Sequence, residues 1–477
     1  MNRNKQLVQK LGTLIVIFAL LLAIPVLTSA QGGGTWVTSF QVQNLGSSPA
    51  TISIYYYDEN GNLKTTQSFS DVQPGSSINV YQPNVPGLPD GFKGSVQVSA
   101  DQPIAAIGSA MVTYSDGRIG NSQYSGVAGT DSGMNKYYLP LVDRRFGGAS
   151  WSSEITIQNA SASPVNVTVT FYDSSGNPIG GATQNPTIAG NGSVTLKQIE
   201  NPGLSDGYLG SAVVQATNTS DRLAVIVNQI SADGRVETYN GFSSGSLAMY
   251  LPTLLLHFGG NDWVTSFQIM NVGSTPASVT VEYYSSGSSS PVKTVHYDDV
   301  ENPKIQPFRS VNRYQPSIDS DLGNGWIGSV RITSNQPVVA VGSQSSSVGT
   351  KASIYNGFSE GSTTVNLPTI LKNFGGSNWV TSFQVMNVGS SDASVTIEYY
   401  AQGSSVATKT VRYNGVENPK IKPFNSINRY QPNVDADLSA GWIGAVKIIS
   451  DQPVVALGSQ NSLNKTGDTV AQYNGLW

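Results

Sequence analysis

The sequence predicts an all-β chain: four tandem antiparallel β-sandwich domains of the immunoglobulin or fibronectin kind, after an N-terminal signal peptide. Three observations predict this fold class. A unit of about 112 residues occurs four times, apolar residues within each unit alternate with a period of two, and Gly-, Pro- and Asn-rich turns separate the β-branched runs. The expected segments are the signal peptide at 1–30 and four repeats at 31–136, 137–248, 249–364 and 365–477.

The first 30 residues have the three parts of a secretory signal. Three basic residues precede an apolar run over 11–27, and the small residues Ser29 and Ala30 follow. We expect cleavage after Ala30 and a secreted, extracellular or cell-surface location. An uncleaved anchor is the alternative, although the run is shorter than the roughly 20 residues that span a bilayer. We expect no membrane span after signal removal.

The four units begin at Trp36, Trp151, Trp263 and Trp379. The 22 residues from Trp263 match those from Trp379 at 18 positions, and the second copy is the most diverged. A unit of this length can enclose its own core, so the units are tandem domains rather than solenoid repeats.

Within each unit, the pattern predicts about seven short strands. In residues 36–44, Trp36, Phe40 and Val42 fall on one face of an alternating strand, and we expect the tryptophans to anchor the cores. A turn with two glycines, Gly91 and Gly94 in the first copy, is expected to need positive φ. The DENGN segment from Asp58 is expected to be a hairpin turn.

Composition limits the chemistry that this chain can perform. There is no cysteine, which excludes disulfides, thiolate metal sites and cysteine nucleophiles, and only 12% of residues are charged. The net charge of −4 gives no basic surface for nucleic acid, so no nucleic-acid partner is expected. The two histidines, His257 and His296, have no counterpart in the other copies, so we expect no enzyme. A convergent pocket of unlike polar residues in repeat 2 would reverse that expectation.

Two weak kinds of site remain. Acidic pairs precede the Gly-Trp turns of the last two copies and could hold Ca²⁺ with help from backbone carbonyls, and no other cofactor is expected. Aromatic residues at turns, or on strands where neighbouring side chains alternate between faces, could stack on sugars. The residues are Asp319, Asp321, Asp435 and Asp437 for the metal, and Trp326, Trp442 and Tyr56 for carbohydrate.

Several motifs recur in order through the repeats: LP followed by FGG, the Trp strand, a GFxGS-type turn, QPIAA and YNGF. With them the chain resembles tandem β-sandwich repeats of secreted bacterial cell-surface proteins. The likeness covers nearly the whole mature chain, although repeat 2 departs at its QP run and its Trp region. It implies a fold and a surface location, and it implies no catalytic residues.

The Leu-Pro segments are distributed unevenly. They precede repeats 2, 3 and 4 at Leu139, Leu251 and Leu367, and none precedes repeat 1. If each segment is a strand of the repeat after it, repeat 1 has an open edge. If each completes the repeat before it, repeat 4 has the open edge. If the segments are only linkers, neither repeat has one. Open edges accept strands from other chains.

The sequence therefore predicts an exported, non-catalytic structural or adhesive cell-surface protein, shaped as a semi-rigid rod. Head-to-tail assembly by strand addition is one hypothesis, with the partner being the chain itself or a cell-surface glycan or protein. The alternative function is a carbohydrate-binding module array.

Overall fold

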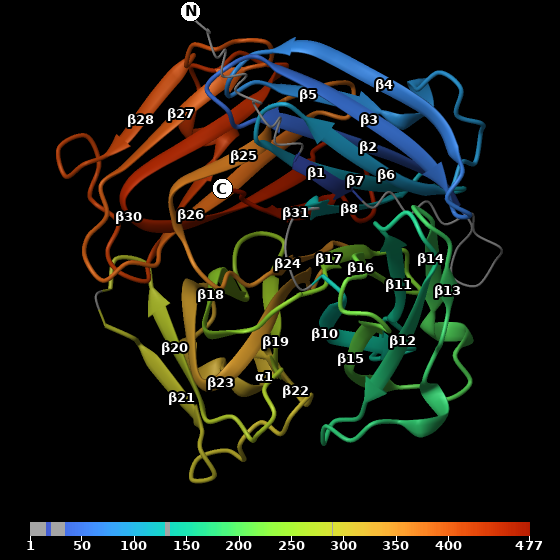
Figure 1. The fold of residues 1–477 in the computed structure, drawn as a ribbon. Helices are drawn as coiled ribbons and strands as arrows, with labels where there is room; N and C mark the ends of the chain where they lie inside the picture. The colour runs from blue at the N-terminus through green and yellow to red at the C-terminus, as the bar shows by residue number, and fades with distance from the viewer. Residues whose placement is uncertain (1–15, 21–33, 129–133, 289) are drawn as a thin grey trace, which may run out of the picture.

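The structure of this protein, a computed structural model, describes residues 16–20, 34–128, 134–288 and 290–477 (Figure 1). The chain is all-β and is built from β-sandwich domains, as the sequence predicts. Of the predicted signal peptide only residues 16–20 are described, as strand β1, and the rest of that segment lies outside the described residues.

The elements follow the four repeats. Repeat 1 contains β2 (Gly34–Asn44), β3 (Ala50–Asp58), β4 (Leu63–Val72), β5 (Ser77–Tyr81), β6 (Gly94–Ala100), β7 (Ile104–Tyr114), β8 (Ile119–Ser125) and β9 (Val127–Ala128). Strand β1 (Val16–Leu20), from the predicted signal peptide, pairs with β6 of this repeat. Repeat 2 contains β10 (Lys136–Arg144), β11 (Ser152–Asn159), β12 (Val165–Tyr172), β13 (Thr187–Ile188), β14 (Ser193–Lys197), β15 (Tyr208–Ala216), β16 (Leu223–Ile230) and β17 (Val236–Asn240).

The last two repeats match each other strand for strand. Repeat 3 contains β18 (Ser246–Leu256), β19 (Trp263–Asn271), β20 (Val279–Ser285), β21 (Lys293–Tyr297), β22 (Ser310–Tyr314), β23 (Trp326–Ser346) and β24 (Ala352–Asn356). Repeat 4 contains β25 (Ser362–Lys372), β26 (Trp379–Asn387), β27 (Val395–Ala401), β28 (Lys409–Tyr413), β29 (Ser426–Tyr430), β30 (Trp442–Ser462) and β31 (Val470–Asn474). The short helices are α1 (Gln315–Ile318), α2 (Gln431–Val434), η1 (Gln82–Asn84), η2 (Gly180–Ala182), η3 (Gln198–Glu200) and η4 (Ser320–Leu322).

Each repeat pairs its strands in two antiparallel sets. In repeat 1 the orders are β5-β2-β7-β8 and β4-β3-β6-β1-β9. In repeats 3 and 4, the 21-residue strands β23 and β30 run through both sets. The first half of β23 pairs with β18 and β20, and the second half pairs with β19 and β24.

Local sequence explains the strands and turns. Along β3, Ile52, Ile54 and Tyr56 are buried while the residues between them are partly exposed, which is the alternation of a strand with one face on a core. The Asp58 carboxylate accepts N–H bonds from Asn60 and Asn62, which confirms the predicted hairpin turn.

The two glycines of the recurring turn have different roles. Gly91, with φ of 71°, has the predicted positive φ, and so do its three equivalents. Gly94 does not: a Cβ atom there would lie 1.9 Å from the Tyr57 carbonyl oxygen, so this position needs glycine because the backbones approach closely.

The four repeats surround a common centre (Figure 1). Strands β8, β17, β24 and β31, one from each repeat, lie there, and each contacts two of the others so that β31 returns to β8. The rod expected from the sequence is therefore wrong, because repeat 4 packs against repeat 1 and closes a ring.

The hydrophobic cores interlock around this ring. Strands β7, β16, β23 and β30 each carry, at the same equivalent position, one residue that packs in the core of a neighbouring repeat. These residues are Ile226 in the core of repeat 1, Val341 in that of repeat 2, Leu457 in that of repeat 3 and Ile107 in that of repeat 4. Each repeat therefore depends on its neighbour for part of its core.

The Leu-Pro segments are strands rather than linkers. We call β10, β18 and β25 the LP strands, and each pairs with a strand of the repeat that follows it: β15, β23 and β30 respectively. The last residues of the same repeat return to this strand, as in the bridge between Tyr138 and Phe242. Each LP strand thus forms one edge of its own repeat.

Candidate functional site

A ring of hydrogen bonds joins the ends of the four central strands. The Asn356 side chain accepts the Asn240 N–H at 3.0 Å and donates to the Asn240 carbonyl at 2.7 Å. Asn240 bonds the Ser125 backbone in the same way, and Asn474 bonds that of Asn356. Ser125, which stands where the other repeats have asparagine, closes the ring by donating to the Asn474 carbonyl. The YNG motif is therefore a contact between repeats.

A single buried carboxyl joins the other end of the same strands. Asp468 of repeat 4 accepts the backbone N–H groups of Val236 in repeat 2 and Ala352 in repeat 3, both at 2.9 Å. Its own N–H donates to the carbonyl of Ile119 in repeat 1 at 2.7 Å. Burial raises the pKa of Asp468 well above its ordinary value. One residue thus connects all four repeats.

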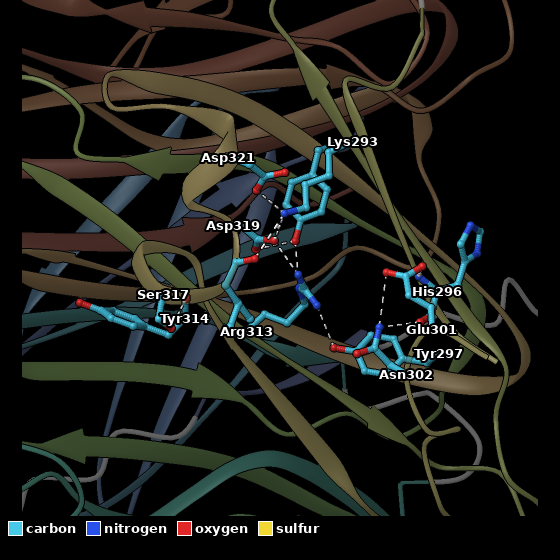
Figure 2. Close-up of polar contacts among 12 residues, drawn as sticks. Lys293, His296, Tyr297, Glu301, Asn302, Arg313, Tyr314, Ser317, Asp319 and Asp321 are labelled. Atoms are coloured by element: carbon cyan, nitrogen blue, oxygen red, sulfur yellow. Dashed lines mark hydrogen bonds and ion pairs between the residues drawn. The ribbon is translucent and has the colours of Figure 1, made fainter. Parts of the chain in front are cut away.

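The first acidic pair predicted to hold calcium is neutralised by the protein's own cations. Asp319 is fully buried and lies 2.9 Å from the Lys293 ammonium and 2.5 Å from the Arg313 guanidinium. In Figure 2 the carboxylates of Asp319 and Asp321 both approach Lys293. Tyr283 donates to the second oxygen of Asp319 at 2.7 Å.

The second pair has the same environment, since Asp435 bonds Arg429 and Lys409, and Asp437 bonds Lys409. In the described part of the chain, no three His, Asp or Glu side chains gather to hold a metal. Repeat 1 carries buried Val80 and Val85 in place of this ionic group. An apolar substitute in the same fold indicates a structural role for the ion pairs.

The rings predicted to bind carbohydrate are core residues, so that prediction is wrong. Tyr56 is 0% exposed, and its hydroxyl donates to Gln67 at 2.6 Å. Trp326 and Trp442 are 9% and 8% exposed. Each indole packs under the second turn glycine and stands edge-on to a buried tyrosine, as Trp326 does to Tyr283. A position at a turn did not imply exposure, because the turn folds its aromatic residue inward.

The tryptophans predicted to anchor the cores are instead partly exposed. Trp36 packs on Val112 and Tyr114 of its own repeat and on Val236 of repeat 2. Trp151 and Trp379 line grooves between repeats. Period-two alternation places these residues on the inner face of the strand. They lie at the beginning of the strand, however, beyond the sandwich core and against a neighbouring repeat.

The two histidines each contact a neighbouring polar side chain. His257 contacts Asp262 at 3.0 Å in the turn before β19, and His296 contacts the Thr280 hydroxyl at 3.2 Å.

Strand β1 occupies the position of the LP strand in repeat 1. Ala19 pairs with Gln97 of β6 and with Val127 of β9. The corresponding LP-strand residues make the same two pairings: Tyr138 with Val213 and Phe242, Tyr250 with Arg331 and Phe358, and Asn366 with Lys447 and Leu476. Gln97, Val213, Arg331 and Lys447 each stand three residues after the second turn glycine, so the four registers are identical.

A groove between repeats 2 and 3 contains two carboxyl groups that the sequence analysis missed. Asp143 on β10 and Glu237 on β17 line a cavity of about 470 Å³, opposite Gln268 of repeat 3. Burial raises the pKa of Asp143 to about 7 and that of Glu237 to about 8. A signal existed in the sequence, because repeats 3 and 4 have leucine at the position of Asp143.

No family model matches this chain, and no curated protein matches it. Among solved structures, it is similar to Thermotoga maritima 1070 at 19% identity and a TM-score of 0.20, over 24% of this chain and 95% of that one. It is also similar to a tetra-tandem repeat in the extending region of a large adhesion protein, at 12% identity and a TM-score of 0.10, over 96% and 98% of the two chains. A third match is the pilus adhesin SpaC from Lactobacillus rhamnosus GG, at 11% identity and a TM-score of 0.12, over 92% of this chain and 56% of that one.

Within the described residues, none of the helices has the length and apolar character needed to cross a membrane.

Proposed function

We propose that this chain is an exported, non-catalytic structural and adhesive protein of the cell surface, and that repeat 1 accepts a β-strand from another polypeptide. The observation that carries the proposal is the shared register of β1 and the LP strands. Residues 16–20 lie inside the predicted signal peptide. Cleavage after Ala30 would therefore remove the only strand that the described structure pairs with the outer edge of β6.

An edge exposed in this way is a template for strand addition. Its N–H and C=O groups are unpaired, and they can be satisfied by an extended peptide that enters antiparallel to β6. The equivalent strands in the other repeats are deeply buried, so a strand added at this edge would also bury apolar surface. Both main-chain pairing and apolar burial favour a donor strand at this edge.

The LP strands define the donor that fits. Two alternate positions point into the core: one holds Tyr137, Met249 or Val365, and the next holds Leu139, Leu251 or Leu367, all nearly fully buried. The expected donor therefore has an apolar residue, any residue, and then leucine. Each LP strand of this chain is already paired in its own repeat, so a second copy has no free strand of this kind among the described residues. We favour a different cell-surface protein as the donor.

A peptide with the sequence of residues 246–256 tests this function directly. Residues 31–477 purified after export should bind this peptide at one site, with a gain in melting temperature. The matched control peptide carries Met249→Asp and Leu251→Asp, which place charges at the two buried positions, and it should not bind. Self-association of residues 31–477 without any peptide would favour the head-to-tail alternative. A stable monomer that ignores the peptide would contradict strand acceptance.

A further inference from the structure

The groove between repeats 2 and 3 has the composition of a ligand site. One wall is formed by β10, the following turn and Trp151 of repeat 2, and the other by β19, β22 and β23 of repeat 3. Its volume of about 470 Å³ lies within the range of small-molecule sites, roughly 300–1,000 Å³.

The two carboxyl groups in this groove are poorly satisfied by the protein. Asp143 is 3% exposed, and its carboxyl accepts one hydrogen bond, from the Ser153 hydroxyl at 3.0 Å. Glu237 is 4% exposed and accepts one from the Ser343 hydroxyl at 2.8 Å. In the described residues, neither carboxyl has a lysine or arginine within ion-pair distance. A carboxyl offers about four sites for hydrogen bonds, so the described residues leave most of this capacity unused.

A third polar group on the opposite wall is also unsatisfied. Gln268 is 4% exposed, and its Nε2 donates to the Asn312 side chain at 3.0 Å. Its Oε1 has no hydrogen-bond partner among the residues that the structure describes. A buried amide oxygen without a donor is costly unless a water molecule or a ligand supplies one. The same amide oxygen is unpartnered at the equivalent residues Gln41 and Gln384, so this feature of the wall is shared by the repeats, whereas the two acids are not.

The ring contains an internal comparison. The equivalent groove between repeats 4 and 1 has a volume of about 390 Å³ and keeps the tryptophan, the turn glycines and the glutamine, as Trp379, Gly375, Gly376 and Gln41. Leu371 stands where repeat 2 has Asp143, and Ala471 stands where it has Glu237. The same framework thus folds without acids, and the acids are a specific addition to one groove. Groups that disfavour folding and gather in one cavity indicate a binding site.

The chemistry of the walls suits a neutral, polyhydroxylated ligand. Because burial raises the pKa values of both acids to near or above neutrality, they keep protons that can be donated to hydroxyl oxygens. Gln268 lines the opposite wall, and Trp151 supplies an apolar ring, one face of which packs under the Arg235 guanidinium. The Arg235 guanidinium on the same wall is paired with Asp233 at 2.8 Å. With both acids protonated and this arginine paired, the walls offer no unpaired charge to attract a cation or an anion.

We infer that the groove between repeats 2 and 3 binds a neutral saccharide, held by Asp143 and Glu237 on one wall and by Gln268 on the other. This inference goes beyond the proposed strand acceptance, because it concerns a different surface and does not depend on loss of the signal peptide.

The test is calorimetric binding of three neutral disaccharides, maltose, cellobiose and diacetylchitobiose, to the full chain. At least one should bind, and Asp143→Leu and Glu237→Ala should each weaken it about tenfold or more, the effect of losing a hydrogen bond to a buried group. Both variants copy residues that repeat 4 already carries, so their melting temperatures should stay equal or rise. The matched control, Leu371→Ala in the other groove, should leave affinity unchanged.

Three results would overturn the inference. None of the three sugars binds the wild-type chain, or the double variant Asp143→Leu/Glu237→Ala binds as well as the wild type, or a primary amine such as putrescine binds in place of the sugars. A fall in melting temperature in both variants without any sugar binding would assign the acids a structural role instead.

Discussion

At the scale of single residues, the repeats fill one equivalent buried position with different kinds of side chain. Repeat 3 buries Arg313 and Asp319 as an ion pair, whereas repeat 1 buries Val80 and Val85 at the same place. A buried ion pair is worth little relative to apolar residues of similar volume, but one member alone leaves an unpaired buried charge. The repeats therefore contain their own mutational comparison.

Substitution in repeat 3 should reproduce that comparison. We expect Asp319→Val alone to lower the free energy of unfolding by about 3–5 kcal/mol, because it leaves the Arg313 guanidinium buried without a carboxylate. Arg313→Val should cost less, because Lys293 still pairs with Asp319 at 2.9 Å. The double variant should cost less than Asp319→Val alone. Thermal or urea unfolding of the three proteins measures this, and a double variant as unstable as the sum of the two singles would contradict it.

The acids of the groove between repeats 2 and 3 predict a pH dependence. Burial raises the pKa of Asp143 to about 7 and of Glu237 to about 8, against about 4 in an unfolded chain. Between these values the folded protein binds more protons than the unfolded chain, so the free energy of unfolding falls as the pH rises from about 4 to about 8. We expect a lower melting temperature at about pH 8 than at about pH 5. The difference should shrink in Asp143→Leu/Glu237→Ala, and an equal slope in both proteins would contradict the assignment.

At the scale of elements, the sequence predicted most of the strands and turns. It did not predict which core or neighbouring repeat packs against each face of a strand. The repeat, the positive φ of Gly91 and the hairpin at Asp58 follow from local chemistry, which is why they were predictable. The role of Trp151 was not predictable, because period two says which face of a strand is inward and not whether a core or a neighbouring repeat covers it. The groove acids were missed for the same reason: Asp143 and Glu237 meet Gln268 only because repeats 2 and 3 pack together.

The asparagine ring is the element-scale contact most open to test. Asn356→Ala removes two hydrogen bonds to the Asn240 backbone, and we expect it to lower the free energy of unfolding by about 1–3 kcal/mol. The matched control is Asn60→Ala, whose side chain lies in an exposed hairpin and should change stability little. Equal melting temperatures for the two variants would show that the ring contributes nothing to stability.

At the scale of the whole molecule, closure of the ring changes how the repeats can act. Each of the four cores includes a residue from a neighbouring repeat, so the repeats form one closed ring. Repeats 1 and 4, the first and last of the array, lie side by side. Tandem repetition in the sequence did not distinguish this closed ring from a rod. The distinction depends on side chains such as Ile107. The sequence shows that this residue is apolar, but not that it packs in the core of another repeat.

Ile107→Asp should open the ring between repeats 4 and 1. Ile107 belongs to the core of repeat 4, so a charge there opposes docking of repeat 1 while that repeat's own core stays intact. Small-angle X-ray scattering should show a larger radius of gyration than in the wild-type chain. Thr113→Asp, at an exposed position on the same strand, should leave the profile unchanged. An unchanged profile for Ile107→Asp would contradict closure through this contact.

Strand acceptance requires that the edge of β6 be open in the exported chain. Hydrogen exchange over β6 in exported residues 31–477 tests it directly, with β15, β23 and β30 as internal references because their LP strands remain in place. If that edge is open, alternate amides of β6 should exchange quickly in the free protein and become protected when the peptide of residues 246–256 is added. Full protection of β6 without any added strand would contradict it.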